Sequence, residues 1–268
     1  MARDTPYREH APHSGLRRHV ACYWSIRCHR PAAAGDDDAV LPDACMDFLF
    51  DLTGDGPEVV GTMTRPLAVH RGSTMDLLGI RFRPGGIGAF VRRLPADDLT
   101  DDVVSLAEVW GADADQLFSR LQDTPATADR VALLDAALLG RIGAEPGDSM
   151  ALDVAGLVER TEGRIRVDDL ARAAGIGRRQ LERRFLAAVG IAPKVACRVV
   201  RFQAALRRMR DEPSRSLAAI ALEAGYHDQA HLTRDFAALA GAPPGAWRLA
   251  QTAGGDDAFV QDGDGGGG

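Results

Sequence analysis

Apolar and polar residues follow two different periodicities along the chain. Short apolar runs separated by Gly, Pro and Asp clusters occupy the N-terminal part and predict strands at 20–26, 46–52, 59–61 and 77–82. Helical spacing follows over 103–121 and 126–142, and again from residue 150 to about 250. The pattern predicts an α+β protein, with a strand-rich N-terminal domain that ends in two helices and an all-α domain after it.

The breaks in this pattern indicate domain boundaries. Ala144-Glu145-Pro146-Gly147-Asp148 interrupts the helical spacing. We therefore predict an N-terminal domain at 1–143, a linker at 144–149 and a second domain at 150–252. Because the linker is short, the two domains are expected to touch. The Gly/Asp-rich end, 253–268, offers little to bury and is expected to be disordered.

Charge is distributed unevenly between these parts. The whole chain has a net charge of −6, which by itself argues against a nucleic-acid partner. Residues 150–252, however, contain 17 Lys and Arg against 11 Asp and Glu, a net charge of +6, whereas 1–149 have a net charge of −8. A basic region joined to an acidic one is typical of a nucleic-acid-binding module.

The segment 167–185 has the pattern of a helix-turn-helix unit. Leu170 and Ala171 lie on one face of a short helix, and Ala171 is small enough for a second helix to cross it closely. Gly175 follows where the chain must turn, with a positive φ that glycine adopts at little cost. Three apolar residues then anchor a second helix, predicted over 178–189: Ile176, Leu181 and Phe185.

The outward face of this second helix carries Arg178, Arg179, Glu182 and Arg183. Arginine can form two hydrogen bonds to guanine or contact phosphates, and a glutamate can accept from cytosine. Taken alone, the pattern fits an ordinary helical hairpin with a solvated basic face equally well.

The same pattern recurs 50 residues later, around Gly225. Ile220-Ala221 corresponds to Leu170-Ala171, and Leu232 and Phe236 correspond to Leu181 and Phe185. Asp228 is placed to cap a helix predicted over 228–240. A helix over 193–209 joins the units; at about 1.5 Å per residue it is about 25 Å long. Such a spacer can hold two recognition helices about 34 Å apart, in successive major grooves.

These features resemble the AraC/XylS family of transcription regulators over about 151–248. The most specific match is the segment Gly225-Tyr226-His227-Asp228-Gln229-Ala230-His231-Leu232-Thr233-Arg234-Asp235-Phe236, followed by Gly241-Ala242-Pro243-Pro244-Gly245-Ala246-Trp247-Arg248. The resemblance implies that bases are read from the positions of Arg179, Glu182, Arg183, Gln229, His231 and Arg234.

Two residues depart from the family pattern. Gly177 stands where a capping serine is usual, and Ala230 replaces a residue that is often polar. The predicted DNA-binding set, which adds one residue from each helix start, is Arg178, Arg179, Glu182, Arg183, Asp228, Gln229, His231 and Arg234.

The N-terminal part, 7–140, resembles an uncharacterised domain of bacterial AraC-type regulators. The resemblance implies that 1–143 form a sensing or dimerisation domain, and it names no ligand. Arg81-Phe82-Arg83-Pro84-Gly85-Gly86 predicts a strand that turns into a helix from about Ile87. This turn can hold an anion beside Arg81 or Arg83, and Trp24 can line an apolar pocket. A small-molecule effector pocket at Trp24, Arg81 and Arg83 is therefore one hypothesis; solvated arginines and a tryptophan packed in the core are the alternative.

The spacing of the cysteines and histidines favours a regulator over an enzyme. The four cysteines form no CxxC pair, and the histidines and cysteines follow no metal-ligand spacing, so we expect reduced thiols, no metal and no cofactor. The competing class is a cysteine- or metal-dependent enzyme with an accessory DNA-binding module.

Partners and location follow from the same features. No apolar run reaches 18 residues and the N-terminus lacks a secretion signal, so a cytoplasmic protein without a membrane-spanning helix is expected. The expected partners are double-stranded DNA, a small-molecule effector and RNA polymerase, with the protein as a monomer or homodimer that acts as an activator or a repressor.

Overall fold

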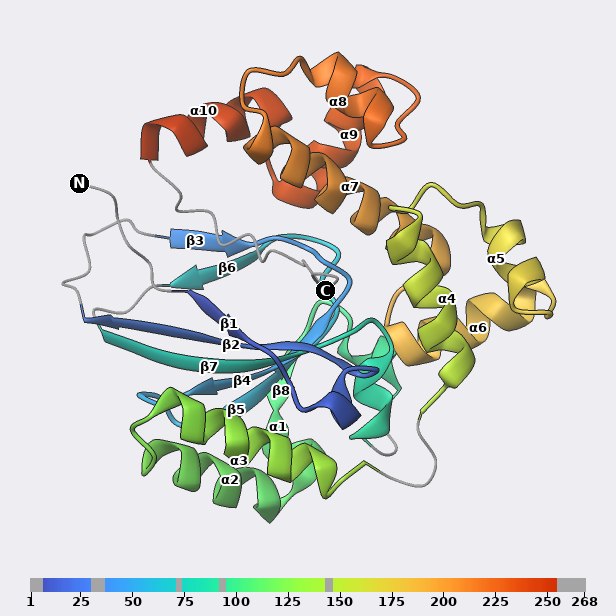
Figure 1. Ribbon diagram of the computed structural model, residues 1–268. Coiled ribbons are helices and arrows are strands. Elements are labelled where there is room, and N and C mark those ends of the chain that lie inside the picture. The colour runs from blue at the N-terminus through green and yellow to red at the C-terminus, as the bar shows by residue number, and fades with distance from the viewer. Residues whose placement is uncertain (1–6, 30–36, 71–73, 92–94, 143–146, 255–268) are drawn as a thin grey trace.

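The N-terminal part is built on a twisted antiparallel sheet (Figure 1). The computed structural model describes residues 7–29, 37–70, 74–91, 95–142 and 147–254. The six-stranded sheet has the order β1 (Arg8–His10), β2 (Val20–His29), β7 (Thr74–Phe82), β4 (Met46–Asp51), β5 (Pro57–Val60) and β8 (Val103–Ser105). A separate two-stranded ribbon consists of β3 (Asp37–Val40) and β6 (Leu67–His70).

Helices cover one face of the six-stranded sheet, and the β3–β6 ribbon lies over the other side in Figure 1. The covering helices are α1 (Leu106–Trp110), α2 (Ala112–Gln122) and α3 (Thr127–Leu139). The core between sheet and helices is aromatic: the Phe48 ring meets Phe82 and Trp110 edge to face, with centroids 4.7 and 5.1 Å apart. Edge-to-face aromatic pairs of this kind stabilise a core beyond the area that they bury.

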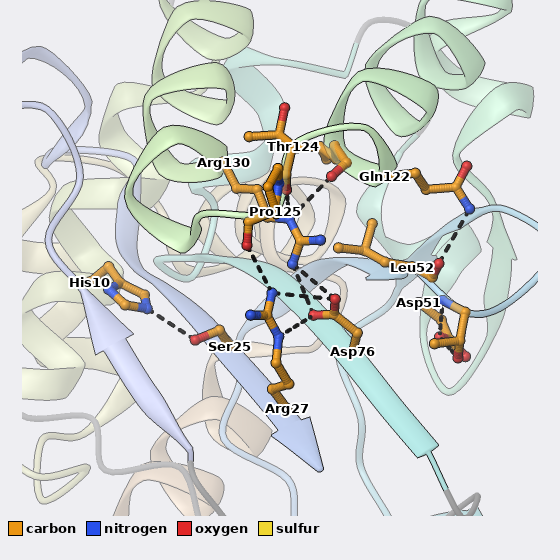
Figure 2. Close-up of polar contacts among 12 residues, drawn as sticks. His10, Ser25, Arg27, Asp51, Leu52, Asp76, Gln122, Thr124, Pro125 and Arg130 are labelled. Atoms are coloured by element: carbon orange, nitrogen blue, oxygen red, sulfur yellow. Dashed lines mark hydrogen bonds and ion pairs between the residues drawn. The ribbon is translucent and has the colours of Figure 1, made fainter. Parts of the chain in front are cut away.

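A charged network fixes α3 to the strands (Figure 2). Arg130 of α3 is buried, and its Nη1 lies 2.9 and 3.0 Å from the two carboxylate oxygens of Asp76 on β7. Arg130 Nε also donates to the Thr124 carbonyl, at 2.6 Å. Arg27 of β2 approaches the same carboxylate at 3.4 Å. One carboxylate thus holds two strands and a helix together.

Two expectations for this part are wrong. The predicted helix over 103–121 starts as strand β8, and only then continues as α1 and α2, because the Ser105 hydroxyl caps a new helix and Gly111 interrupts it with φ +61°. The helix expected from Ile87 is a short 3₁₀ turn, η2 (Gly86–Ala89). Two further 3₁₀ turns are η1 (Ser14–Leu16) and η3 (Ala96–Leu99). The strands predicted at 20–26, 46–52, 59–61 and 77–82 are confirmed as β2, β4, β5 and β7.

The C-terminal part, 147–254, is helical. Its helices are α4 (Ser149–Arg160), α5 (Val167–Ala173), α6 (Arg178–Val189), α7 (Pro193–Asp211), α8 (Leu217–Glu223), α9 (Gln229–Ala240) and α10 (Pro244–Gly254). Figure 1 shows α7 in the middle, with α4–α6 at one end and α8–α10 at the other. The α+β class with an all-α C-terminal part is confirmed.

The two parts touch, as expected. Leu41 and Ala44, which follow β3, are buried in the same core cluster as Phe202 of α7. Gln203 Nε2 of α7 donates to the Pro42 carbonyl at 2.6 Å. The domain limits stay a prediction, since half of the predicted linker (144–146) and most of the predicted tail (255–268) lie outside the described residues.

Candidate nucleic-acid interface

The first predicted unit folds as a helix, a tight turn and a second helix. Gly175 has φ +67°, and the chain reverses there because the Ile176 N–H reaches back to the Ala171 carbonyl, at 3.1 Å. A positive φ is inexpensive only for glycine, so the sequence selects this turn. The inner face of α6 is buried against α5 through Leu181 and Phe185. The predicted limits of the second helix, 178–189, are confirmed.

The outer face of α6 is presented to solvent. Arg178, Arg179 and Arg183 are exposed, and Glu182 is partly exposed. Arg178 is held by Glu182 at 2.9 Å and by Asp168 at 3.2 Å, and these carboxylates raise the pKa of its guanidinium. Among the described residues, no ion pair involves Arg179 or Arg183. These two side chains are therefore available to meet an external anion or base without giving up an internal partner.

Helix α6 begins without a side-chain cap. Gly177 occupies the N-cap position in an extended conformation, φ −70° and ψ 148°, which suits serine as well as glycine. A Cβ added at Gly177 meets no atom within 4 Å. The residue that departs from the family pattern thus leaves one amide of the first turn without the usual hydroxyl partner.

Replacing Gly177 with serine should therefore stabilise the protein, by a few tenths of a kcal/mol to about 1 kcal/mol, because a hydroxyl would accept from the first turn and the unfolded chain would lose freedom. Urea unfolding followed by circular dichroism measures this. Gly177→Ala is the matched control, since it reduces chain freedom without supplying an acceptor. Equal stability of the two variants would contradict the capping account.

The second unit repeats this geometry. Gly225 has φ +82°, and the Tyr226 N–H donates to the Ala221 carbonyl at 2.8 Å. The Asp228 carboxylate accepts from the His231 N–H at 2.7 Å, so the predicted N-cap is confirmed. This hydrogen bond, together with the contact to His227, lowers the pKa of Asp228. Asp228 thus starts the recognition helix, and its place in the predicted DNA-binding set includes this structural role.

The outer face of α9 carries the other predicted residues. Gln229, Ala230 and Arg234 are exposed. His231 is half-buried: its ring meets Tyr226 edge to face at 5.1 Å, and its Nε2 lies 3.7 Å from the Asp235 carboxylate. The imidazole is therefore oriented by neighbours while one side faces outward.

Helix α7 holds the two units in fixed positions. Arg198 Nε of α7 pairs with Asp235 of α9 at 2.8 Å, and Arg208 of α7 pairs with Glu162, just after α4, at 2.7 Å. Phe202 of α7 is fully buried against Phe236 of α9, with ring centroids 5.1 Å apart. At about 1.5 Å per residue the helix, Pro193–Asp211, is about 28 Å long. Both recognition helices therefore belong to one packed body.

Comparison with protein families agrees with this geometry. Residues 170–250 match the model of a helix-turn-helix domain of the AraC type. The C-terminal part is an AraC-type helix-turn-helix domain. Residues 8–105 match a domain of unknown function, DUF6597. Among curated proteins, none matches the chain significantly. A DNA-binding domain of this type favours a transcription regulator over an enzyme.

Similar solved structures include ToxT from Vibrio cholerae. One ToxT structure is 10% identical, covers 91% of this chain and 97% of that chain, and has a TM-score of 0.44. Another, wild-type ToxT bound to an unsaturated fatty acid, is also 10% identical, covers 85% of this chain and 94% of that chain, and has a TM-score of 0.42.

The predicted effector residues outside the helix-turn-helix domain do not form one site. Arg81 is buried between two carboxylates, with Asp47 at 3.3 Å and Asp43 at 3.6 Å. Trp24 Nε1 donates to Asp47 at 3.1 Å, and its indole lies on Gly79, where a Cβ would be only 2.0 Å away. Burial raises the pKa of Asp47 to about 6, against the opposing effect of Arg81. Since its charge is already balanced, Arg81 is a poor receptor for a further anion.

Arg83 lies apart from this cluster. Its Nε donates to the Arg17 carbonyl at 3.0 Å, and its Nη1 is 4.0 Å from Glu159 of α4. The anion site expected at the Gly85-Gly86 turn therefore finds no support in the contacts of Arg81 and Arg83.

Three of the four thiols do not resemble catalytic nucleophiles. Burial raises the pKa of Cys22 to about 12, and burial raises the pKa values of Cys45 and Cys197 as well. A thiol of this kind stays protonated at neutral pH, whereas a nucleophilic cysteine needs a lowered pKa. Within the described residues no group of three His, Cys, Asp or Glu is placed to hold a metal ion, and no helix is both long and apolar enough to cross a bilayer.

A pocket of about 390 Å³ lies where the helix-turn-helix domain meets the N-terminal part. The N-terminal part contributes Ile87, Val91 and Leu99, and α6 contributes Ala187, Ala188 and Arg183. Arg184 and Asp148 also line the pocket, and two hydrogen bonds of 2.7 Å join their side chains. The pocket is thus mostly apolar, and of its charged lining residues Arg184 and Asp148 pair with each other, while Arg183 has no ion pair among the described residues. Sequence reasoning missed it because its walls come from distant segments.

Proposed function

We propose that this protein is a sequence-specific transcription regulator that reads two successive major grooves of DNA, one with α6 and one with α9. The observation that carries the proposal is the pair of matched units around Gly175 and Gly225, fixed to α7, with polar outer faces free of packing. A single helix-turn-helix is common in proteins, but two units on one rigid spacer fit the repeat of the DNA groove.

The outer faces supply the chemistry that base reading needs. Arg179 and Arg183 match the paired acceptors of guanine or a phosphate, and Gln229 matches adenine. Glu182 can accept from cytosine, while the Ala230 methyl group can pack on the methyl group of thymine. On α9, Arg234 and His231 are the other two side chains proposed to contact DNA. Phosphate contacts by the arginines position the protein, and the contacts to base edges specify the sequence.

Selection of binding sites from random DNA, followed by gel-shift titration, tests the proposal. We expect an enriched site of roughly 15–20 bp, about two turns of DNA. Affinity should fall steeply with salt, because each phosphate contact releases a counterion. Binding that does not distinguish the enriched site from random DNA would refute sequence-specific recognition.

We further propose that a small-molecule effector binds the pocket between Leu99 and Arg183. A ligand changes DNA binding only if it has different affinities for two states of the protein, and a pocket shared by the N-terminal part and α6 allows such a difference. Thermal-shift screening with a metabolite panel, followed by gel shifts, tests this. A ligand that raises the melting temperature but leaves DNA affinity unchanged would contradict effector control. RNA polymerase contact and homodimer formation stay predictions.

A further inference from the structure

The C-terminal end of recognition helix α6 is buried against the N-terminal part. Val189 and Gly190 are buried, and two threonine hydroxyls of the N-terminal part reach them. Thr62 Oγ1 donates to the Val189 carbonyl at 2.6 Å, and Thr100 Oγ1 donates to the Gly190 carbonyl at 2.5 Å. The last carbonyls of a helix have no partner within the helix. Here a different part of the chain supplies it.

The two threonines lie in two loops that are joined to each other by hydrogen bonds. The Asp101 N–H donates to the Thr62 carbonyl at 3.1 Å, and the Gly61 N–H donates to the Asp102 carbonyl at 3.0 Å. The Asp101 carboxylate accepts from both the backbone N–H and the hydroxyl of Thr64, at 2.7 and 2.6 Å. We call these two loops, 61–64 and 99–102, the platform. Its internal bonds keep the two hydroxyls at a fixed spacing.

The fit between the platform and α6 is close. Gly190 has φ +87°, and a Cβ there would lie 2.9 Å from the Ala96 carbonyl oxygen and 3.1 Å from Thr100 Oγ1. These distances leave no room for a side chain between α6 and the N-terminal part. Movement of the platform would therefore move the end of α6 with it.

The second recognition helix has no such attachment. Helix α9 ends at Gly241, which has φ +73° and is exposed, and the nearest atom to a Cβ there is Pro66 Cγ at 3.7 Å. In the described residues, no hydrogen bond joins the N-terminal part to the end of α9. Within the described residues, the two recognition helices thus differ in one respect: the C-terminal end of α6 accepts hydrogen bonds from the N-terminal part and that of α9 does not, while α7, which both units share, is bonded to the N-terminal part through Pro42.

We infer that Thr62 and Thr100 are positioning residues for DNA reading by α6. The inference rests on the proposed function. The platform fixes the C-terminal end of α6, and with it the angle at which this helix enters the groove, whereas α9 is positioned by its packing on α7. The N-terminal part thus controls selectivity at the stretch of DNA that α6 reads, here named the first half-site, and not at the second half-site, read by α9.

The test uses the full-length protein and its selected DNA site. Footprints of Arg183→Ala and Arg234→Ala first assign the half-sites, since each variant should lose protection at one of them. Binding is then compared for Thr62→Val, Thr100→Val and the double variant, which keep the side-chain shape and remove the hydroxyls. Thr62→Ser, which keeps a hydroxyl, is the conservative variant. Thr53→Val is the matched control, because among the described residues the Thr53 hydroxyl bonds to Asp51 alone, in an exposed turn.

We expect the double valine variant to bind its site about tenfold more weakly. The two hydrogen bonds hold α6 in the orientation that binds DNA, so their loss lowers the fraction of molecules with α6 in that orientation. Base discrimination should fall at the first half-site and stay at the wild-type level at the second. Thr62→Ser and Thr53→Val should bind like the wild type. Thermal melting separates these effects from loss of folding; if the buried Thr62→Val variant unfolds, the half-buried Thr100→Val variant carries the test alone.

Two results would overturn the inference: a folded valine variant with wild-type discrimination at both half-sites, or one that loses discrimination equally at both. Failure of the proposed function looks different, because the wild-type protein itself would then select no sequence.

Discussion

Arg183→Ala should weaken binding to the selected DNA site by about 1–3 kcal/mol, or roughly five- to 150-fold, and relax selectivity at one base pair. Arg183 is exposed on α6, and among the described residues it takes part in no ion pair. Its contact with DNA therefore costs no internal bond, and its loss is not offset by the release of a carboxylate. Arg179→Ala is expected to act in the same way for the same reason.

Arg178→Ala should have a smaller effect than Arg183→Ala. Arg178 must first leave Glu182 and Asp168 before it can contact DNA. Arg120→Ala, on the exposed face of α2 in the N-terminal part, is the matched control and should change nothing. Gel-shift titrations against the selected site and its single-base variants measure all three. If Arg183→Ala weakens binding to every sequence equally, the arginine contacts phosphates, and its assignment as a base-reading residue is wrong.

Phe202→Ala should destabilise the protein by about 3–5 kcal/mol and abolish DNA binding near the melting temperature. Phe202 is fully buried, and its ring contacts Phe236 of α9, which in turn lies 5.7 Å from the Trp247 ring of α10. The substitution leaves a cavity at the contact between α7 and the second unit. The loss of packing destabilises the fold, and the distance between the two recognition helices is no longer fixed.

Leu222→Ala is the control for the phenylalanine. Leu222 is 64% exposed on α8, so its truncation should change stability by no more than about 0.5 kcal/mol. Urea unfolding followed by circular dichroism measures both variants. A Phe202→Ala variant as stable as Leu222→Ala would contradict the role given to this contact.

The helix-turn-helix units were predictable because their signals are local. The turn glycines, Gly175 and Gly225, require a positive φ, and the Asp228 cap and the apolar spacing fix the helix that follows. Helix α6 accordingly has the predicted limits, and α9 starts one residue later than predicted. Periodicity also separates inner from outer faces, so exposure of Arg179 and Arg183 followed from the sequence.

Features that depend on distant pairing were not predictable. Arg81 faces Asp47 because β4 and β7 pair antiparallel with these residues opposite each other, and the sequence alone does not give this register. The β3–β6 ribbon and strand β8 are short and carry weak alternation. Thr62 and Val189 are 127 residues apart, so no sequence window contains the contact that attaches α6 to the platform.

The spacing of the two half-sites tests the central claim most directly. Hydroxyl-radical footprinting on the selected DNA should show two protected stretches on one face, about 10–10.5 bp apart from centre to centre. Insertion of about 5 bp between them should leave only one half-site protected, because it rotates the second groove to the opposite face while α7 keeps the recognition helices in place. Equal protection of both half-sites after that insertion would show that α6 and α9 are not held as one rigid reader.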